Sequence, residues 1–214
     1  MNYFIDFDGT LYDTAEFKKD MLNAIAKTCH KKNRELQYEN ILFDVSAALK
    51  IGLDINGLCE YMANKYHIEK VILDNAVNNV LDDGKKYIYE DSIPYLLNLK
   101  KEGHNLCMLT YSAQSSVEFQ KRKIIGSGLD KLFDKIEITT KPKGEFKTDY
   151  KNAVFVDDNP KELLGLCQNN PAKVIRIKRA NGKYSNIPLD AKVEETTNLY
   201  DLFEHANSKH NMTC

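Results

Sequence analysis

Short apolar runs alternate with helical patterns over much of the chain, and this alternation limits the possible folds more than any other feature. Five runs are rich in β-forming side chains and bounded by polar or turn residues: Tyr3–Phe7, Asn105–Thr110, Lys135–Thr139, Ala153–Val156 and Val174–Ile177. Helical patterns lie between or after them, at Ser92–Glu102, Gln114–Ile125, Pro160–Gln168 and Leu199–Ala206. Strands that alternate with helices predict crossover connections. The predicted class is α/β, a parallel sheet covered by helices on both faces.

One segment, from about residue 15 to residue 85, breaks the alternation. Its apolar residues recur at helical spacing, as at Phe17 and Ile25, and it contains no strand pattern. A turn-rich stretch at 50–57 is predicted to separate two of its helices. The predicted division of the chain is a helical insert at 15–85, a sheet domain formed by 1–14 and 86–207, and a disordered tail at 208–214.

Composition and charge exclude several classes of partner. Among 214 residues, 30 are Lys or Arg and 31 are Asp or Glu, so the formal net charge is −1. This balance provides no basic surface for a nucleic acid polymer or an anionic membrane. No run of 18 apolar residues occurs, and the N-terminus lacks the features of a signal peptide. The five cysteines lie far apart without a C-x-x-C pair, which argues against disulfides and structural zinc. We expect a cytoplasmic monomer or homodimer.

Polar side chains follow four of the predicted strands at their carboxyl ends. They are Asp6, Asp8 and Gly9 after the first strand, Thr110, Tyr111 and Ser112 at the end of the second, Lys141, Lys143 and Lys147 after the third, and Asp157 and Asp158 after the fourth. Ligands of open parallel sheets bind beyond the carboxyl ends of the strands, where the strand order reverses. We therefore expect these residues to share one site.

The residue types at these strand ends suit phosphoryl transfer. Four carboxylates at one rim repel one another and require a cation, and hard oxygen donors without His or Cys favour Mg²⁺. A metal beside a hydroxyl and an ammonium group stabilises the charge of a phosphoryl group in transfer. Asp6 can attack phosphorus, and Asp8 can protonate the leaving oxygen and later activate water. Gly9 permits a sharp turn close to the ligand, and Thr10 can hydrogen-bond within the turn.

The motifs resemble those of a known family. F-I-D-F-D-G-T-L, then C-M-L-T-Y-S, then a lysine followed by V-F-V-D-D-N-P-K-E-L, are similar to the four motifs of the haloacid dehalogenase (HAD) superfamily of phosphotransferases, in the same order. The resemblance covers roughly residues 1–14 and 86–205. It implies a Rossmann-like core whose first and second motifs are separated by an inserted helical cap. Such a cap closes over the site and selects the leaving group.

The resemblance also implies roles for individual residues. Asp6 would be the nucleophile, Asp8 the general acid/base, and Thr110 a phosphate-binding hydroxyl, with Tyr111 and Gly9 beside it. Asp6, the main-chain carbonyl of Asp8 and an acidic residue of the last motif would hold Mg²⁺. In the last motif we expect Asp158 to ligate directly, whereas Asp157 acts through water or lysine.

The phosphate-binding lysine is less clearly defined by the resemblance. Lys141 ranks first because it precedes proline, as is frequent in the family, and Lys143 ranks second. Lys147 remains an alternative, since an ammonium group needs only reach and charge.

Each motif also has a simpler explanation. Asp8-Gly9 alone is a common turn, Asp158-Asn159-Pro160 alone suits a helix N-terminus, and the lysines alone suit a solvated loop. Their joint occurrence at four strand ends favours a site. The leading expectation is a Mg²⁺-dependent phosphomonoester hydrolase that acts on a small phosphorylated metabolite through an aspartyl-phosphate. The alternatives are a phosphosugar mutase of the same superfamily and a non-hydrolytic domain that binds a partner. Asp8 argues against a dehalogenase, because a halide leaving group needs no proton.

Overall fold

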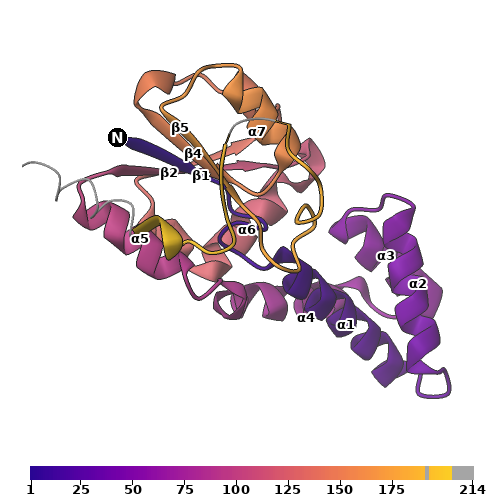
Figure 1. Ribbon diagram of the computed structural model, residues 1–214. Helices are drawn as coiled ribbons and strands as arrows, with labels where there is room; N and C mark the ends of the chain where they lie inside the picture. Colours follow the sequence, from indigo (N-terminus) through magenta and orange to yellow (C-terminus); the bar gives the residue numbers. More distant parts are fainter. Residues whose placement is uncertain (191–192, 204–214) are drawn as a thin grey trace, which may run out of the picture.

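A six-stranded parallel sheet forms the centre of the larger part of the molecule (Figure 1). The computed structural model describes residues 1–190 and 193–203. The strands are β1 (Asn2–Ile5), β2 (Asn105–Tyr111), β3 (Lys135–Thr139), β4 (Ala153–Asp157), β5 (Lys173–Ile177) and β6 (Glu194–Thr196), in the order β3-β2-β1-β4-β5-β6. The predicted α/β class with a parallel sheet is confirmed.

The strand order places β1 and β4 side by side at the centre of the sheet. From β1 the chain extends the sheet first toward β2 and β3, and then in the other direction through β4, β5 and β6. Asn2 pairs with Ala153 and Ile5 with Val156, so the two strands end at the same level. The strand order therefore reverses between the carboxyl ends of β1 and β4, where ligands of such sheets bind.

Helices cover both faces of the sheet, because the buried strands carry apolar side chains on both of their faces. The helices of this part are α5 (Ser92–Lys101), α6 (Val117–Ser127) and α7 (Pro160–Cys167), with 3₁₀ turns η1 (Gly84–Tyr87), η2 (Gln114–Ser116), η3 (Leu129–Leu132), η4 (Lys143–Glu145) and η5 (Tyr150–Asn152). Phe4 and Phe155 stack on one face of the sheet, whereas Ile5 and Val156 belong to the main core on the other.

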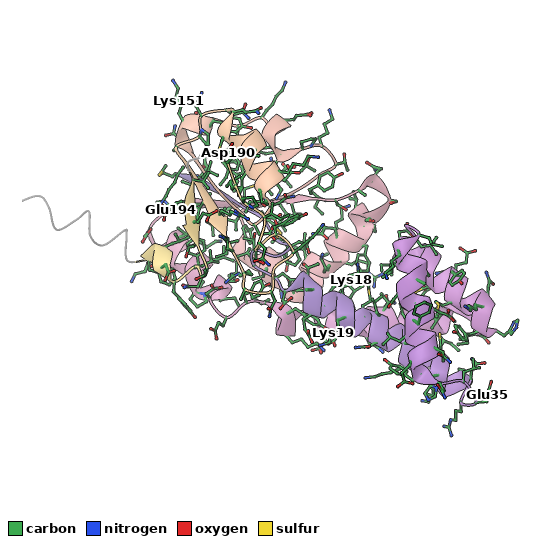
Figure 2. All side chains as sticks on the ribbon, turned by 45° about the vertical axis from the view of Figure 1, so that its right-hand side comes forward. Lys18, Lys19, Glu35, Lys151, Asp190 and Glu194 are labelled. Carbon is green, nitrogen blue, oxygen red and sulfur yellow. The ribbon has the colours of Figure 1, made fainter. Side chains whose placement is uncertain are left out.

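The insert forms a group of four helices beside the sheet part (Figure 1). They are α1 (Thr14–Lys32), α2 (Tyr38–Lys50), α3 (Ile55–Tyr66) and α4 (Lys70–Asp82). Their apolar faces join one core, which includes Phe17, Leu58 and Leu73, and no strand lies among these described residues. Charged side chains such as Lys19 and Glu35 project outward and are exposed (Figure 2).

Several element boundaries differ from the predicted ones. The first strand ends at Ile5 because the next residues form a tight turn, in which Leu11 N–H donates to the Phe7 carbonyl at 3.0 Å. Strand β6 was not predicted, since Glu194–Thr196 is a short polar edge strand without an apolar pattern. The end of the predicted last helix and the predicted tail at 208–214 lie outside the described residues. No helix in the described ranges is long and apolar enough to cross a lipid bilayer.

Candidate active site

Three buried carboxylates meet at the point where the strand order reverses. Asp6 directly follows β1, Asp157 is the last residue of β4, and Asp158 comes next. The Asp6 N–H donates to the Val156 carbonyl at 2.9 Å, which extends the pairing of the two strands by one residue. One carboxylate oxygen from each of the three acids lies within 4.8 Å of the others. The structure thus brings together three of the predicted acidic residues.

Burial and mutual repulsion make these carboxylates hard to ionise. Burial is the largest cause that raises the pKa of Asp158 to about 9, and the charges of Asp6 and Asp157 add to it. Burial likewise raises the pKa of Asp6 to about 7, although Lys143 opposes the change. A buried charge that lacks sufficient compensation favours the neutral form or a bound counter-ion. Among the described residues, Lys143 is the positive group that lowers the pKa values of Asp6 and Asp158, and a bound cation would lower them further.

Lys143 bridges two of these acids from the turn η4. Its ammonium group donates to Asp6 Oδ1 and to Asp157 Oδ2, each at 2.6 Å, and its side chain is 3% exposed. Burial alone would lower the pKa of Lys143, but the charges of Asp157 and Asp6 raise it above its usual value. Lys143 therefore remains charged inside the site.

The structure reverses the predicted ranking of the lysines. Lys141, which ranked first, is exposed, as is Lys147. The reason is local geometry: Lys141 lies before the turn η4, where its main-chain N–H bonds the Thr139 hydroxyl, whereas the turn directs Lys143 toward the acids. Proximity to proline was therefore the wrong criterion.

Asp157 and Asp158 differ in their hydrogen bonding. Asp157 accepts from Lys143 on one oxygen and from the Asn159 N–H, at 2.8 Å, on the other. In the part of the chain that the structure describes, no hydrogen bond reaches the Asp158 carboxylate. Asp157 is therefore held by Lys143 and by the main chain, whereas Asp158 has neither contact.

Gly9 lets the first loop lie directly against Asp158. Its φ of +73° is in the left-handed region, and a Cβ at this position would lie 2.2 Å from Asp158 Oδ2. Thr10, in contrast, does not hydrogen-bond within the turn as predicted, because its buried hydroxyl has no partner among the described residues. The Thr10 carbonyl instead accepts from Arg179 at 2.7 Å, and Arg179 pairs with the buried carboxylate of Asp91 at 2.5 Å. These contacts of Arg179 hold the loop in place, and the sequence analysis did not predict them.

Asp8 lies apart from the three clustered acids and has its own partners. Its Oδ1 forms an ion pair with Lys123 and accepts from the Thr14 hydroxyl, and its Oδ2 accepts from Gln120 Nε2 at 2.6 Å. Burial would raise the pKa of Asp8, but the Lys123 charge and these hydrogen bonds lower it below its usual value. Asp8 is thus a held, ionised carboxylate, and its side chain is still 30% exposed.

The residues at the end of β2 occupy unequal positions. The Thr110 hydroxyl is buried and accepts from Gln120 Nε2 at 3.2 Å, so Gln120 connects it to Asp8. Tyr111, which was predicted beside it, is 48% exposed at the strand end. Thr110 is therefore linked to Asp8 through Gln120, whereas Tyr111 points to the surface.

Comparison with known proteins identifies the family. A sequence model of the haloacid dehalogenase-like hydrolases matches residues 2–166. The chain belongs to this family. No curated protein sequence matches it.

Solved structures of HAD proteins share the fold at low sequence identity. A HAD phosphatase from Thermococcus onnurineus is 18% identical, with a TM-score of 0.64 over 96% of this chain and 97% of that one. A putative β-phosphoglucomutase from Thermotoga maritima is 13% identical, with a TM-score of 0.61 over 97% and 99%. A 2-haloacid dehalogenase from Pseudomonas syringae is 19% identical, with a TM-score of 0.63 over 98% and 100%. The fold therefore occurs with several chemistries.

The acidic cluster of this HAD hydrolase fits a divalent cation. HAD proteins generally use such a metal, and the cluster here consists of hard carboxylate oxygens. The Asp158 carboxylate has no hydrogen-bond partner among the described residues, and burial together with the neighbouring acids raises the pKa values of Asp6 and Asp158, so a cation here would be stabilised by both carboxylates. The donor set contains no His or Cys within this group, which argues against a soft metal.

Sequence reasoning missed the partners of Asp8. Gln120 and Lys123 are three residues apart on α6, so they project from the same face of the helix. The predicted helix at Gln114–Ile125 contains both residues, but their distance in sequence from Asp8 hides the contact. The Gln-x-x-Lys spacing is the signal that points to them.

Removal of Lys143 should destabilise the protein far more than removal of Lys141. Lys143→Met leaves two buried carboxylates without their ammonium partner, and we expect the free energy of unfolding to fall by about 3–5 kcal/mol. Lys141→Met, at an exposed position, should change it by less than about 0.5 kcal/mol. Urea denaturation without added metal measures both. Equal effects of the two substitutions would contradict the placement of Lys143.

Binding of a divalent cation, with Mg²⁺ as the probe, should release protons near neutral pH. Because the pKa of Asp158 is raised to about 9, the free protein holds a proton there that the metal must displace. The affinity should therefore rise about tenfold per pH unit between about pH 7 and pH 9 and level off above. Calorimetry in buffers of different ionisation enthalpy measures the released protons.

Two variants serve as controls for this prediction. Asp158→Asn should abolish the pH dependence, whereas Asp149→Asn, at an exposed acid, should retain it. A pH-independent affinity in the wild type would refute the prediction.

Proposed function

We propose that the protein is a Mg²⁺-dependent phosphomonoester hydrolase that acts on a small phosphorylated metabolite. The observation that carries this proposal is the Asp6 carboxylate, which lies among two further acids and the Lys143 ammonium group, with the partly exposed Asp8 two residues away. Lys143 bonds only Oδ1 of Asp6 among the described contacts. The second oxygen is thus available to attack phosphorus.

The reaction proceeds in two displacements at phosphorus. In the first, an Asp6 oxygen bonds phosphorus, the bond to the ester oxygen breaks, and Asp8 gives its proton to the leaving alcohol. The incoming phosphate dianion favours protonation of Asp8 for this step. In the second, water attacks phosphorus of the aspartyl-phosphate, the bond between phosphorus and the Asp6 oxygen breaks, and Asp8 takes the proton of that water, so that inorganic phosphate and the free Asp6 carboxylate result. Lys143 and Thr110 bind the phosphoryl oxygens throughout.

The same carboxylates would hold the metal. Asp6, Asp158 and the main-chain carbonyl of Asp8 are its proposed ligands, and Asp157 acts through Lys143. When bound, the cation supplies the positive charge that stabilises the phosphoryl oxygens and offsets the repulsion between acids.

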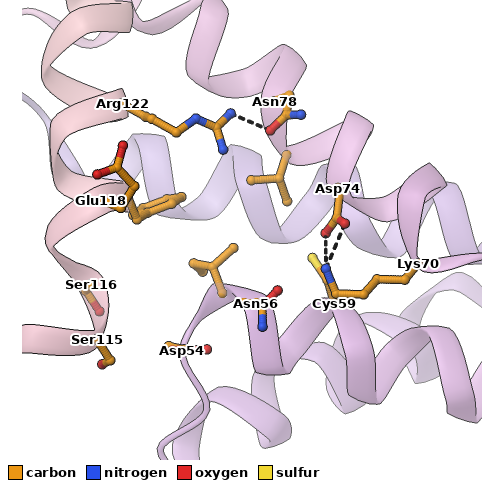
Figure 3. A pocket seen from close by; sticks show the side chains of 13 residues that line it. Asp54, Asn56, Cys59, Lys70, Asp74, Asn78, Ser115, Ser116, Glu118 and Arg122 are labelled. Carbon is orange, nitrogen blue, oxygen red and sulfur yellow. Dashed lines mark hydrogen bonds and ion pairs between the residues drawn. The ribbon is translucent and has the colours of Figure 1, made fainter.

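The helical insert is the proposed cap that selects the leaving group. A cavity of about 420 Å³ lies between α3, α4 and α6, and α6 also carries the partners of Asp8 (Figure 3). Its two cationic side chains are engaged, Lys70 with Asp74 at 2.7 Å and Arg122 with Asn78 at 2.5 Å. Asp54 and Glu118 add negative charge. The lining thus carries three acidic and two basic side chains, which favours a neutral polar leaving group over one that carries a second phosphate.

Asp8 supports a phosphate ester over a haloacid as the substrate. A halide leaves without a proton, so the contacts that hold Asp8 would serve no step of dehalogenation. The four described cysteines carry free thiols, which supports a reducing compartment, and we place the enzyme in the cytoplasm.

The deciding experiment is a screen of phosphorylated metabolites with Mg²⁺, read as inorganic phosphate released. Wild type should release phosphate, and Asp6→Asn, folded as judged by circular dichroism, should lose at least about a thousandfold in kcat/KM. Asp149→Asn is the control and should retain activity. Equal turnover by Asp6→Asn would exclude the proposal. Isomerised sugar phosphate without net phosphate release would assign a mutase, and halide release from haloacids a dehalogenase.

A further inference from the structure

We infer that Lys123 and Gln120 act as positioning residues that hold the Asp8 carboxylate for proton transfer at its Oδ2 atom. The inference rests on the proposed hydrolase, in which Asp8 exchanges a proton with the leaving group and with water. It adds two residues of α6 to the reaction, and neither belongs to the acidic and lysine motifs at the strand ends.

Lys123 is a buried charge with one described carboxylate partner. The residue is 5% exposed, and its ammonium group forms an ion pair with Asp8 Oδ1. No other ion pair of Lys123 is present in residues 1–190 and 193–203. Burial of an ammonium group is costly, and an apolar side chain would pack there without that cost. The ion pair with Asp8 thus explains why a lysine occupies this position.

Aromatic rings fix the location of this ammonium group. Lys123 Nζ lies 5.4 Å from the ring centre of Phe7, 5.9 Å from that of Tyr12 and 5.8 Å from that of Phe17. All three rings are buried, and cation–π attraction favours the charge among them. The rings come from the loop that carries Asp8 and from α1. The rings therefore keep the Lys123 ammonium group next to the Asp8 carboxylate.

Gln120 connects Asp8 to the proposed phosphate-binding hydroxyl. Its Nε2 donates to Asp8 Oδ2 at 2.6 Å and to Thr110 Oγ1 at 3.2 Å, which uses both hydrogens of the amide. The residue is 5% exposed and follows the same helix face as Lys123. One side chain thereby sets the spacing between the acid/base and the group that faces the phosphate.

The hydrogen-bond inventory of Asp8 identifies the atom that exchanges the proton. A carboxylate has about four acceptor sites, two on each oxygen. Lys123 and the Thr14 hydroxyl occupy both sites of Oδ1, and Gln120 occupies one site of Oδ2. No second donor reaches Oδ2 from the described residues, which leaves one of its sites for the substrate or water. A proton moves between this site and the leaving oxygen in the first step, and between water and this site in the second.

Lys123→Met tests the role of the lysine with a side chain of similar length. If Lys123 positions Asp8, kcat for the best alkyl phosphate of the screen should fall about 10²- to 10⁴-fold, while KM stays within about threefold. With p-nitrophenyl phosphate, whose leaving group needs no proton, the first step should persist and the second should slow. Stopped-flow absorbance should then show a burst of about one p-nitrophenolate per enzyme, followed by slow turnover.

Three further variants separate positioning from a structural role. Lys121→Met removes an exposed lysine from the same helix and should behave as wild type. Lys123→Arg keeps the charge and should recover part of kcat. In an Asp8→Asn background, Lys123→Met should cause no additional loss, because the residue acts through Asp8. This double variant leaves no unpaired carboxylate at position 8, so it remains informative if the single variant unfolds.

The outcomes distinguish this inference from the proposed function. A wild type that is inert toward the whole phosphate-ester screen would refute the hydrolase itself. An active wild type with Lys123→Met turning over like Lys121→Met would refute the positioning role alone. Equal losses from Lys123→Met in the wild-type and Asp8→Asn backgrounds would also refute it, since the effect would then be independent of Asp8.

Discussion

The contact of the Lys143 ammonium group with Asp6 and Asp157 is the interaction on which the rest of the site depends. It joins a residue after β1, a residue at the end of β4 and a turn from the chain between β3 and β4. Two buried carboxylates this close would otherwise repel each other strongly. The ammonium group offsets the repulsion between the carboxylates at the two strand ends. The same arrangement leaves one Asp6 oxygen and the Asp158 carboxylate for a ligand.

Around this contact the backbone is held from two sides. Gly9 lies so close to Asp158 that no side chain fits between them. Arg179 lies in the segment that follows β5 and is paired with Asp91. It donates to the Thr10 carbonyl. Since these braces come from segments far apart in sequence, the loop geometry is a property of the folded domain and not of the D-x-D-G-T motif alone.

Five of the six strands, and the polar residues that follow four of them, could be predicted from the sequence for physical reasons that particular residues illustrate. Apolar runs such as Ala153–Val156 are buried on both faces and therefore recognisable, and the polar residues that follow them meet because parallel strands end at one edge. The choice between Lys141 and Lys143 was wrong because it depends on a 3₁₀ turn after Pro142, which nearby residue types do not reveal. Lys123 and Gln120 were missed because their partner lies more than a hundred residues away. Strand β6, with Glu194 and Glu195, has no apolar signal at all.

The central claim is that Asp6 carries the phosphoryl group between substrate and water. Its most direct test is to quench the enzyme in acid during turnover of a phosphate ester with Mg²⁺, digest it, and locate any phosphoryl group by mass spectrometry. The account predicts one acid-stable, base-labile phosphoryl group on the peptide that contains Asp6, and none on that peptide in Asp6→Asn. A phosphoryl group on a different residue, or product formation with no phosphorylated peptide when the second step is slowed, would contradict it.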